Sequence, residues 1–230
     1  VKDIKKLPSI MHKAFEVATT GRPGPVLIDI PKDIQFQKGK YTKPNFKKEN
    51  NSKGKASFNG QDTNIGAAVD LIKKSSKPIL YTGGGVINSG PKATELLREL
   101  VSLTGFPITS TLQGLGAFPG YDQQFLGMLG MHGTYEANNA MHDCDLMLNI
   151  GARFDDRITG KIDEFSPKSK KVHIDIDPSS INKIIKVDLA IVGDVTSVIS
   201  KINKTITKIK NGHSKSNKSN IAKWWEQIEK

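Results

Sequence analysis

The sequence holds a single cysteine, Cys144, among 230 residues. One thiol cannot form a disulfide within the chain, and this favours a reducing, cytoplasmic setting. No apolar run approaches the roughly 18 residues that a membrane-spanning helix needs, so we expect no membrane partner. The chain begins at Val1 without a methionine or a signal-peptide pattern, which leads us to expect an internal piece of a longer protein.

Arginine and aromatic residues are also scarce. Aromatics make up 7% of the chain and very few of its 34 basic residues are arginine, although the net charge is +11. Surfaces that bind nucleic acids usually interleave basic and aromatic side chains, whereas the lysines here crowd into two polar stretches, 38–55 and 201–223. We therefore expect a solvated lysine-rich surface and no nucleic-acid partner. The hydrophobic content of 37% permits a packed core and excludes a wholly disordered chain.

The first 37 residues predict one helix and one strand. Apolar residues recur at helical spacing over 7–18, and the glycine–proline cluster 21–25 ends the pattern. The apolar run Val26–Ile30 then predicts a buried strand. This piece is too small to fold alone, so we expect residues 1–37 to be the end of a preceding domain. Residues 38–60 are poor in apolar side chains and are predicted to be a linker.

Strands and helices alternate over residues 61–209. The predicted helices cover 64–75, 91–103, 134–142 and 195–209, with a short one opening at Pro178. The predicted strands cover 78–81, 107–110, 146–150, 172–176 and 189–192. Short apolar strands separated by helices predict an α/β fold with a mostly parallel sheet flanked by helices, and such sheets bind ligands at the carboxyl ends of their strands. Residues 210–230 turn polar again and are predicted to be a linker toward a further domain.

Two glycine-containing segments lie where a predicted helix begins. Gly83, Gly84 and Gly85 follow a predicted strand, and glycines there let the backbone approach an anion. A plain tight turn explains them equally well. In the segment 128–134, two glycines flank His132, so backbone amides and an imidazole face one crevice. A hydrogen-bonded loop histidine is the alternative interpretation of His132.

Charged residues follow other predicted strands. The segment Gly151–Arg157 contains two arginines and two aspartates, which suit phosphate pairing and an orienting carboxylate; a surface ion-pair cluster is the alternative. Asp175 and Asp177 share one face at a strand end, and Asp194 repeats the theme after the last strand. Such an acid fits a ribose hydroxyl or a helix N-cap equally. Metal-ligand spacing and a serine nucleophile motif are lacking, so these residues favour nucleotide binding and show no catalytic group.

Five segments of the sequence resemble parts of thiamine-diphosphate enzymes. Residues 21–33 resemble the closing segment of the first domain in those enzymes. The other four follow in order at 111–119, 129–134, 151–160 and 173–178. Together they resemble the catalytic, large subunits of the acetolactate synthase family over nearly all of the chain, except the linker and the tail. The resemblance implies that residues 1–37 end a pyrimidine-binding domain and that residues 61–209 form a Rossmann-like central domain that binds FAD.

The resemblance further implies an enzyme that condenses two pyruvates, or pyruvate and 2-oxobutyrate, at the start of branched-chain amino-acid biosynthesis. Its chemistry belongs to thiamine diphosphate held by Mg²⁺, and FAD does no net redox work. The groups that hold thiamine diphosphate and Mg²⁺ are expected outside this chain. We therefore expect no catalytic residue, no metal ligand and no activity in the chain alone. The implied partners are 2-oxo acids, further large subunits in a homodimer or homotetramer, and a regulatory small subunit.

The same resemblance assigns residues to FAD and to a channel. The residues implied to contact FAD are Arg22, Gly83, Gly84, Gly85, Thr111, Leu112, Gln113, Leu129, Gly130, Met131, His132, Gly151, Ala152, Arg153, Asp155, Arg157, Ile158, Asp175, Ile176, Gly193 and Asp194. Met131, Asp156 and Arg157 are implied to line the access channel in which herbicides bind in this family. The alternatives are another thiamine-diphosphate carboligase or decarboxylase acting on a different 2-oxo acid, and a non-enzymatic flavin-binding module.

Overall fold

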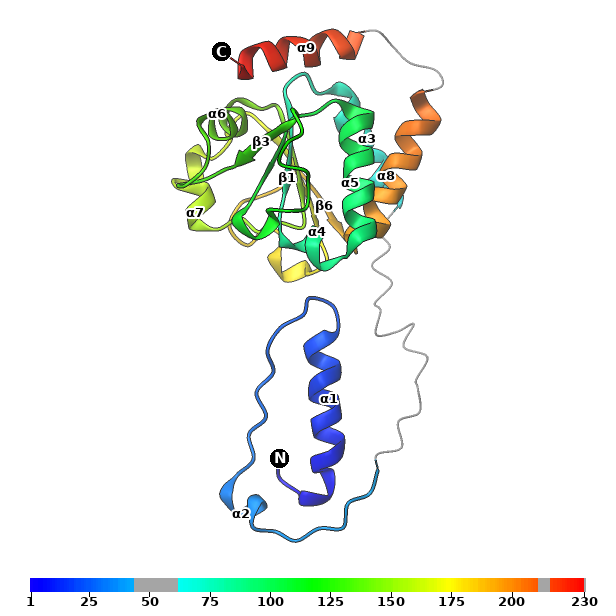
Figure 1. The fold of residues 1–230 in the computed structure, drawn as a ribbon, viewed down its shortest axis with the longest axis vertical. Coiled ribbons are helices and arrows are strands. Elements are labelled where there is room, and N and C mark those ends of the chain that lie inside the picture. The colour runs from blue at the N-terminus through cyan, green and yellow to red at the C-terminus, as the bar shows by residue number, and fades with distance from the viewer. Residues whose placement is uncertain (44–61, 211–215, 230) are drawn as a thin grey trace. The chain divides into compact units, whose positions relative to one another are not determined.

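A computed structural model describes residues 1–43, 62–210 and 216–229 (Figure 1). The chain divides into two compact units, Val1–Ser57 and Phe58–Lys230. The division falls inside the predicted linker 38–60, most of which lies outside the described residues. Among the described residues, the first unit contains helices and irregular segments, and the second contains the sheet.

Helix α1, Leu7–Thr19, is the main element of the first unit, and its prediction from the apolar spacing is confirmed. The short helices η1, Ile4–Lys6, and α2, Lys32–Gln35, flank it in the sequence. The predicted strand Val26–Ile30 is wrong, because these residues form no regular element and are mostly exposed. A strand needs a neighbouring strand for its backbone hydrogen bonds, and the described part of this unit contains no strand.

A parallel sheet of six strands forms the centre of the second unit, in the order β3-β2-β1-β4-β5-β6. Its strands are β1 Pro78–Thr82, β2 Ile108–Ser110, β3 Phe125–Met128, β4 Leu146–Ile150, β5 Lys170–Asp175 and β6 Leu189–Val192. The predicted α/β fold with a parallel sheet is therefore confirmed. β1 and β4 are buried along their whole length, as strands covered on both faces must be. The strand order reverses between β1 and β4, which makes this pair the switch point of the sheet.

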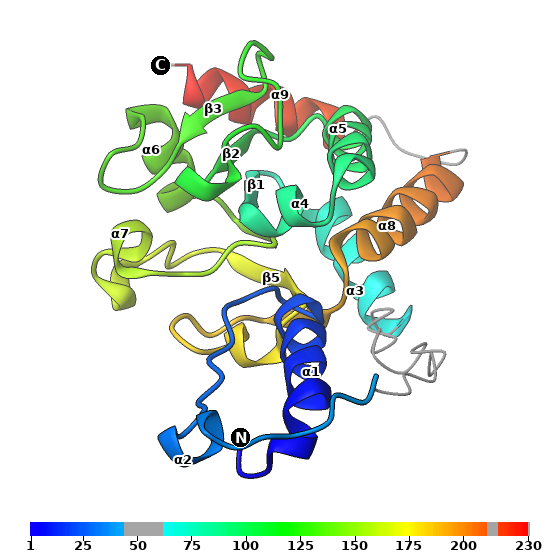
Figure 2. The same cartoon turned by 60° about the horizontal axis from the view of Figure 1, so that its bottom comes forward.

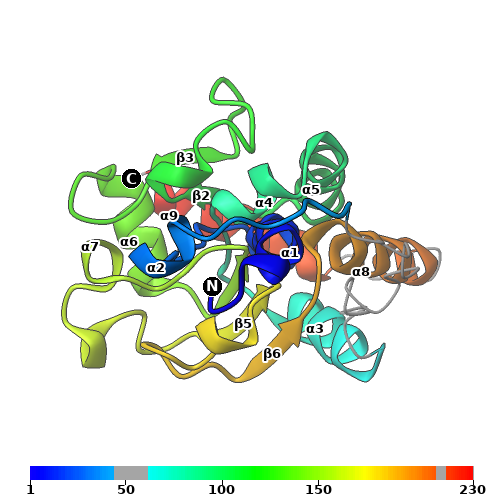
Figure 3. The same ribbon diagram turned by 90° about the horizontal axis from the view of Figure 1, so that it is seen from below.

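Helices cover the sheet on both faces (Figures 2 and 3). One layer consists of α3 Asp62–Lys74, α4 Gly84–Asn88, α5 Pro91–Thr104 and α8 Val195–Lys210. The other contains α6 Tyr135–Asp143 and α7 Asp156–Thr159, and three short 3-10 helices complete the loops: η2 Leu112–Gly114, η3 Ile162–Glu164 and η4 Pro178–Ser180. Successive side chains of β1 pack against opposite helix layers. Leu80 packs in the core under α3, α5 and α8, whereas Ile79 and Tyr81 pack in the core under α6.

Helix α9, Ser216–Ile228, lies across the amino end of the sheet. Trp224 is buried, and its Nε1 donates to the carbonyl oxygen of Pro78, the first residue of β1, over 2.9 Å. Trp225 Nε1 donates to Gly105 O over 3.0 Å, shortly before β2. The sequence predicts a linker over 210–230, and the structure differs because the two tryptophans find both apolar surface and carbonyl acceptors on the domain.

The buried thiol of Cys144, at the end of α6, is expected to make stability sensitive to alkaline pH. Burial raises the pKa of this thiol from 9.0 to about 11. Between these values the unfolded chain releases the proton while the folded chain keeps it. The free energy of unfolding should therefore fall as the pH rises through this window, by about 2–3 kcal/mol in total. Urea unfolding at a series of pH values from about 8 to 11 measures this slope.

Cys144→Ala provides the control, because alanine removes the titration and leaves a small apolar side chain. Tyr81 is a second acid whose pKa burial raises, so the variant should keep a fall in stability that begins at higher pH. The same slope in the variant and the parent between about pH 9 and 10 would contradict the assignment to Cys144.

Candidate functional site

Each of the six strands ends in a segment that the sequence marks as a candidate site. Because the strands are parallel, their carboxyl ends lie along one edge of the sheet. The structure places at this edge every cofactor-binding candidate of the second unit, in the segments 83–85, 111–113, 129–132, 151–158, 175–176 and 193–194. The remaining candidate, Arg22, belongs to the first unit, where it is exposed.

Glycines allow the segments after β1 and β4 to approach each other at the switch point. Gly83 N donates to Ile150 O over 3.1 Å, and Gly85 N donates to Gly151 O over 2.9 Å. A Cβ atom on Gly83 would lie 2.5 Å from Gly151 O, and one on Gly85 would lie 2.7 Å from the Cα of Gly151. Gly151 itself has a φ of +62°, which favours glycine. Close packing therefore explains Gly83 and Gly85 structurally, and contact with a nucleotide stays a prediction.

The segment after β2 is tied back to β1. Thr111 N donates to Thr82 O over 2.9 Å, and Thr111 Oγ1 accepts from Gly114 N over 3.0 Å as the cap of η2. These bonds hold Leu112 and Gln113 at the edge with exposed side chains; Leu112 is 65% exposed. An exposed leucine beside an exposed amide offers a ligand both an apolar and a polar contact.

An asparagine holds the segment after β3. Gly130 N donates to Asn138 Oδ1 over 2.9 Å, and Asn138 Nδ2 donates to Gly130 O over 3.1 Å. Met131 N then donates to Arg157 O over 3.0 Å, which joins this segment to the one after β4. The side chains of Met131 and His132 are exposed. Hydrogen bonds within the protein therefore fix the backbone of this segment, while the apolar side chain of Met131 and the imidazole of His132 stay accessible.

The segment after β4 alternates between the core and solvent. Ala152 and Phe154 are buried, whereas Arg153 and Asp155 are exposed. Arg157 Nε lies 3.9 Å from Asp156 Oδ2, and both side chains are mostly exposed. An ion pair of that length and exposure contributes little to stability. The arginines are therefore accessible to an anion rather than held in a tight ion-pair cluster.

The acidic candidates Asp175, the last residue of β5, and Asp194, which follows β6, have local structural partners. Asp175 is 7% exposed, and its Oδ1 accepts from Asp177 N over 2.9 Å. Asp194 Oδ1 accepts from Ser197 N over 3.1 Å, as an N-terminal cap of α8 would, and its Oδ2 accepts from Ser89 Oγ over 3.3 Å. The capping interpretation of Asp194 is therefore observed. Ile176 and Gly193 lie beside these two acids, and Gly193 N donates to Asp175 O.

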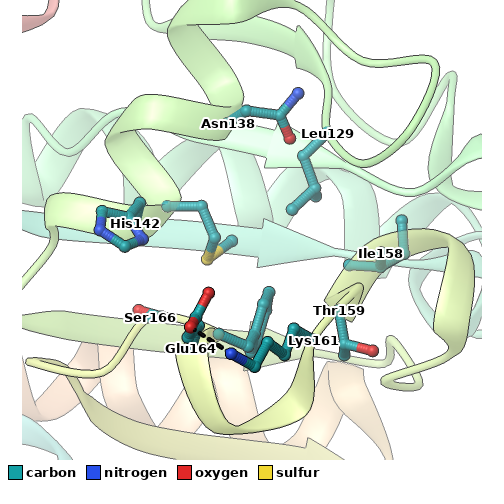
Figure 4. A pocket seen from close by; sticks show the side chains of 10 residues that line it. Leu129, Asn138, His142, Ile158, Thr159, Lys161, Glu164 and Ser166 are labelled. Carbon is teal, nitrogen blue, oxygen red and sulfur yellow. Dashed lines mark hydrogen bonds and ion pairs between the residues drawn. The ribbon is translucent and has the colours of Figure 1, made fainter.

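A cavity of about 270 Å³ adjoins the site, between α6 and residues 158–166 (Figure 4). Its lining residues are Leu129, Asn138, Met141, His142, Ile158, Thr159, Lys161, Glu164, Phe165 and Ser166. Leu129 and Ile158 are predicted site residues, and Lys161 and Glu164 pair with each other over 2.5 Å. Apolar, polar and charged side chains therefore line the cavity together, and the candidate arginines and aspartates are not among them.

The sequence does not point to two asparagines that shape the edge, the exposed Asn138 and the buried Asn149. Asn138 brackets Gly130, and Asn149 does the same for Ala152, since its Oδ1 accepts from Ala152 N and its Nδ2 donates to Ala152 O. The signal for Asn149 is a polar residue inside the otherwise apolar run Leu146–Ile150. Asn138 gives no such signal, because asparagine is ordinary on the polar face of a helix.

The described ranges, 1–43, 62–210 and 216–229, contain neither a helix that could span a membrane nor a metal-binding group of side chains. None of the helices in them is long and apolar enough to cross a bilayer. They also contain no group of three or more histidine, cysteine, aspartate or glutamate side chains placed to hold a metal ion.

A parallel sheet in the order 3-2-1-4-5-6, covered by helices on both faces, defines a doubly wound α/β domain. The family model "Thiamine pyrophosphate enzyme, central domain" matches residues 65–202, and the chain belongs to that family. The match covers the sheet and the helices α5, α6 and α7 completely.

Relatives with assigned names align along the chain. The acetolactate synthase large subunit of Haemophilus influenzae is 41% identical over 228 residues, which is 99% of this chain and 39% of the relative. The isozyme 3 large subunit of Escherichia coli is 40% identical over 235 residues, again 39% of its length. The chloroplastic acetolactate synthase of Arabidopsis thaliana is 44% identical over 209 residues, or 90% of this chain and 30% of that protein. The chain thus spans about two fifths of the bacterial relatives it matches.

Proposed function

We propose that this chain is the flavin-binding central segment of an acetolactate synthase large subunit, together with the end of the domain that precedes it. About 40% identity to large subunits of that name along the whole chain supports the proposal. The complete protein then condenses two pyruvates, or pyruvate and 2-oxobutyrate, in branched-chain amino-acid biosynthesis. Thiamine diphosphate, held by Mg²⁺ outside this chain, supplies the carbon–carbon bond chemistry.

The observation that carries the FAD assignment is the convergence of six strand-end segments at one edge of the sheet. Sheets of this order bind dinucleotides outside the carboxyl ends of their strands, at the switch point. Here the switch point lies between β1 and β4, where Gly83 and Gly151 bring the two segments together. A cofactor across it meets backbone on one side and exposed side chains on the other.

The chemistry of the exposed side chains fits a flavin dinucleotide. Arg153 and Arg157 are accessible cations that suit the pyrophosphate, because guanidinium groups pair well with phosphate oxygens. Leu112 and Met131, 65% and 64% exposed, offer apolar surface for a ring system. Asp175, a largely buried acid at the end of β5, suits a ribose hydroxyl. In this proposal the chain binds and orients the flavin and moves no proton or hydride.

Met131, Asp156 and Arg157 are proposed to line the channel by which substrates and herbicides reach the active centre. The bond from Met131 N to Arg157 O and the exposure of all three side chains support a shared surface. The proposed partners of the complete protein are 2-oxo acids, further large subunits and a regulatory small subunit. The proposed location is the cytoplasm, where a lone thiol such as Cys144 stays reduced.

Flavin titration of the complete subunit tests this proposal through the two arginines. Arg153→Ala and Arg157→Ala should each weaken FAD binding about ten- to a hundredfold, because each removes a charge-assisted contact of roughly 1.5–3 kcal/mol. Fluorescence quenching of the flavin measures the Kd.

Arg98→Ala is the matched control, since Arg98 is an exposed arginine on α5. It should bind FAD like the parent. If both candidate variants also bind FAD like the parent, these arginines are surface ion-pairing residues and the assignment fails.

A further inference from the structure

Three buried polar side chains form one row across three neighbouring strands. Tyr81 of β1 is in register with Asn149 of β4, and Asn149 is in register with His173 of β5. All three are 0% exposed. Residues in register on parallel strands point to the same face of the sheet, so the row runs directly across the switch point.

All three side chains bond to the backbone of one dipeptide, Ala152–Arg153, in the segment that follows β4. Asn149 Nδ2 and His173 Nε2 lie 2.9 Å and 3.0 Å from Ala152 O. Asn149 Oδ1 accepts from Ala152 N over 3.1 Å. Tyr81 OH donates to Arg153 O over 3.3 Å. Four hydrogen bonds from three strands therefore hold two residues of the loop.

The loop needs these bonds because it folds back onto the sheet. Gly151 turns the chain with a φ of +62°, and Ala152 and Phe154 are then buried. The Phe154 ring packs edge-on against the His173 ring, with centroids 5.3 Å apart, and 6.1 Å from the centroid of Tyr81. Backbone polar groups buried against an apolar surface need partners. The row supplies them, which leaves Arg153 and Asp155 on the exposed side of the segment.

The His173 contact also has a defined direction. Ala152 O can only accept, so Nε2 carries the proton. His173 Nδ1 is buried and has no partner in the described part of the chain. The imidazole therefore donates from Nε2 to the loop, and Asp175 Oδ2 lies 3.6 Å from the same nitrogen.

We propose that Tyr81, Asn149 and His173 are positioning residues of the flavin site, which act on the cofactor by fixing the 152–155 segment and with it Arg153. The proposal rests on the proposed function where flavin affinity is concerned. Its structural part, that the row orders the segment, stands without the flavin.

Two variants of the complete subunit test the row with little change in volume. Tyr81→Phe removes one hydroxyl, and Asn149→Leu removes both bonds to Ala152. Amide hydrogen exchange over 152–155 should become faster in both, and FAD should bind about threefold and about tenfold more weakly, respectively. In the Arg153→Ala background, the same two changes should lose most of their effect on the Kd, because the residue that they position is gone.

Asn203→Leu is the matched control. Asn203 is another buried asparagine, whose Nδ2 donates to Leu96 O over 3.0 Å, and it lies on α8 away from the row. This change should lower the melting temperature without altering the FAD Kd or the exchange of residues 152–155. A merely structural role for the row predicts the same pattern for Tyr81→Phe and Asn149→Leu, and that pattern would overturn the inference.

The two proposals fail in different ways. If the parent subunit binds no FAD, the proposed function is wrong, and the exchange data alone decide whether the row orders the segment. If the parent binds FAD and the variants keep both its Kd and slow exchange over 152–155, the positioning role is wrong while the flavin site stands.

Discussion

Gly83→Ala is expected to lower the free energy of unfolding by about 3 kcal/mol, because the new methyl group has no space. Its Cβ would lie 2.5 Å from Gly151 O and 2.6 Å from Ala152 Cα. Both neighbours are backbone atoms of the segment that follows β4, so the clash is relieved only if the segments after β1 and β4 separate. Loss of the bond from Gly85 N to Gly151 O should follow. Urea or thermal unfolding measures the change, and flavin titration should show weakened binding in parallel.

Gly66→Ala makes the same chemical change where space is free. Gly66 lies inside α3, and nothing lies within 4 Å of a Cβ built there. Alanine should stabilise the protein by about 0.5–1 kcal/mol, since glycine weakens a helix interior. Opposite signs at the two positions support the close approach at the switch point. Equal, small effects would contradict it.

Removal of the flavin from the complete subunit is expected to abolish acetolactate formation, and 5-deaza-FAD is expected to restore it. The candidate contacts are glycines, arginines and strand-end aspartates, which hold phosphate and ribose and do not tune a redox potential. A redox-dead analogue should therefore serve as well as FAD. Bound to the native state alone at about a hundredfold excess over Kd, either flavin should add about 2.7 kcal/mol of stability.

Melting temperature and turnover are measured on the same flavin-free preparation, with and without each flavin. A rise in melting temperature without activity for the deaza compound would show that the electronics of the flavin matter, and the structural role would be lost. No rise with either flavin would count against the flavin site itself.

The sequence predicted the sheet well because its central strands are short apolar runs buried on both faces. β6 begins and ends at the predicted residues, and β1 and β4 differ from the prediction by one residue or none. The predicted positions of most candidate segments follow from the same pattern, because these segments come directly after predicted strands, whereas the segment 128–134 is placed by the helix that begins after it. Local hydrophobic periodicity therefore predicts the fold, and the location of the candidate site stays a prediction.

The elements that the sequence does not predict correctly depend on tertiary contacts. β3, Phe125–Met128, was not predicted, because it is a half-buried edge strand interrupted by Gly127 at a φ of +84°. Val26–Ile30 has the composition of a strand but no neighbouring strand in the described residues. The polar composition of 210–230 predicts a linker in place of helix α9, because the contacts of its two tryptophans with the amino end of the sheet are tertiary contacts.

The row of Tyr81, Asn149 and His173 was beyond sequence reasoning for a similar reason. Each residue belongs to a different strand, and the sequence around it does not link it to the other two. Only the register of the paired strands places the three side chains next to one another beneath Ala152. For the acidic residues, the sequence identifies the candidates but does not decide between their roles. The sequence left a cap and a ribose contact equally open for Asp194, and the structure supplies the cap.

A crystal structure of the complete subunit grown with FAD tests the central claim most directly. We expect the pyrophosphate across the carboxyl ends of β1 and β4, within hydrogen-bonding distance of Arg153 or Arg157. Tyr81, Asn149 and His173 should hold the segment 152–155 as they do here. Density for the flavin at another edge of the sheet, or a fully occupied flavin that leaves Gly83, Gly151 and both arginines untouched, would contradict it.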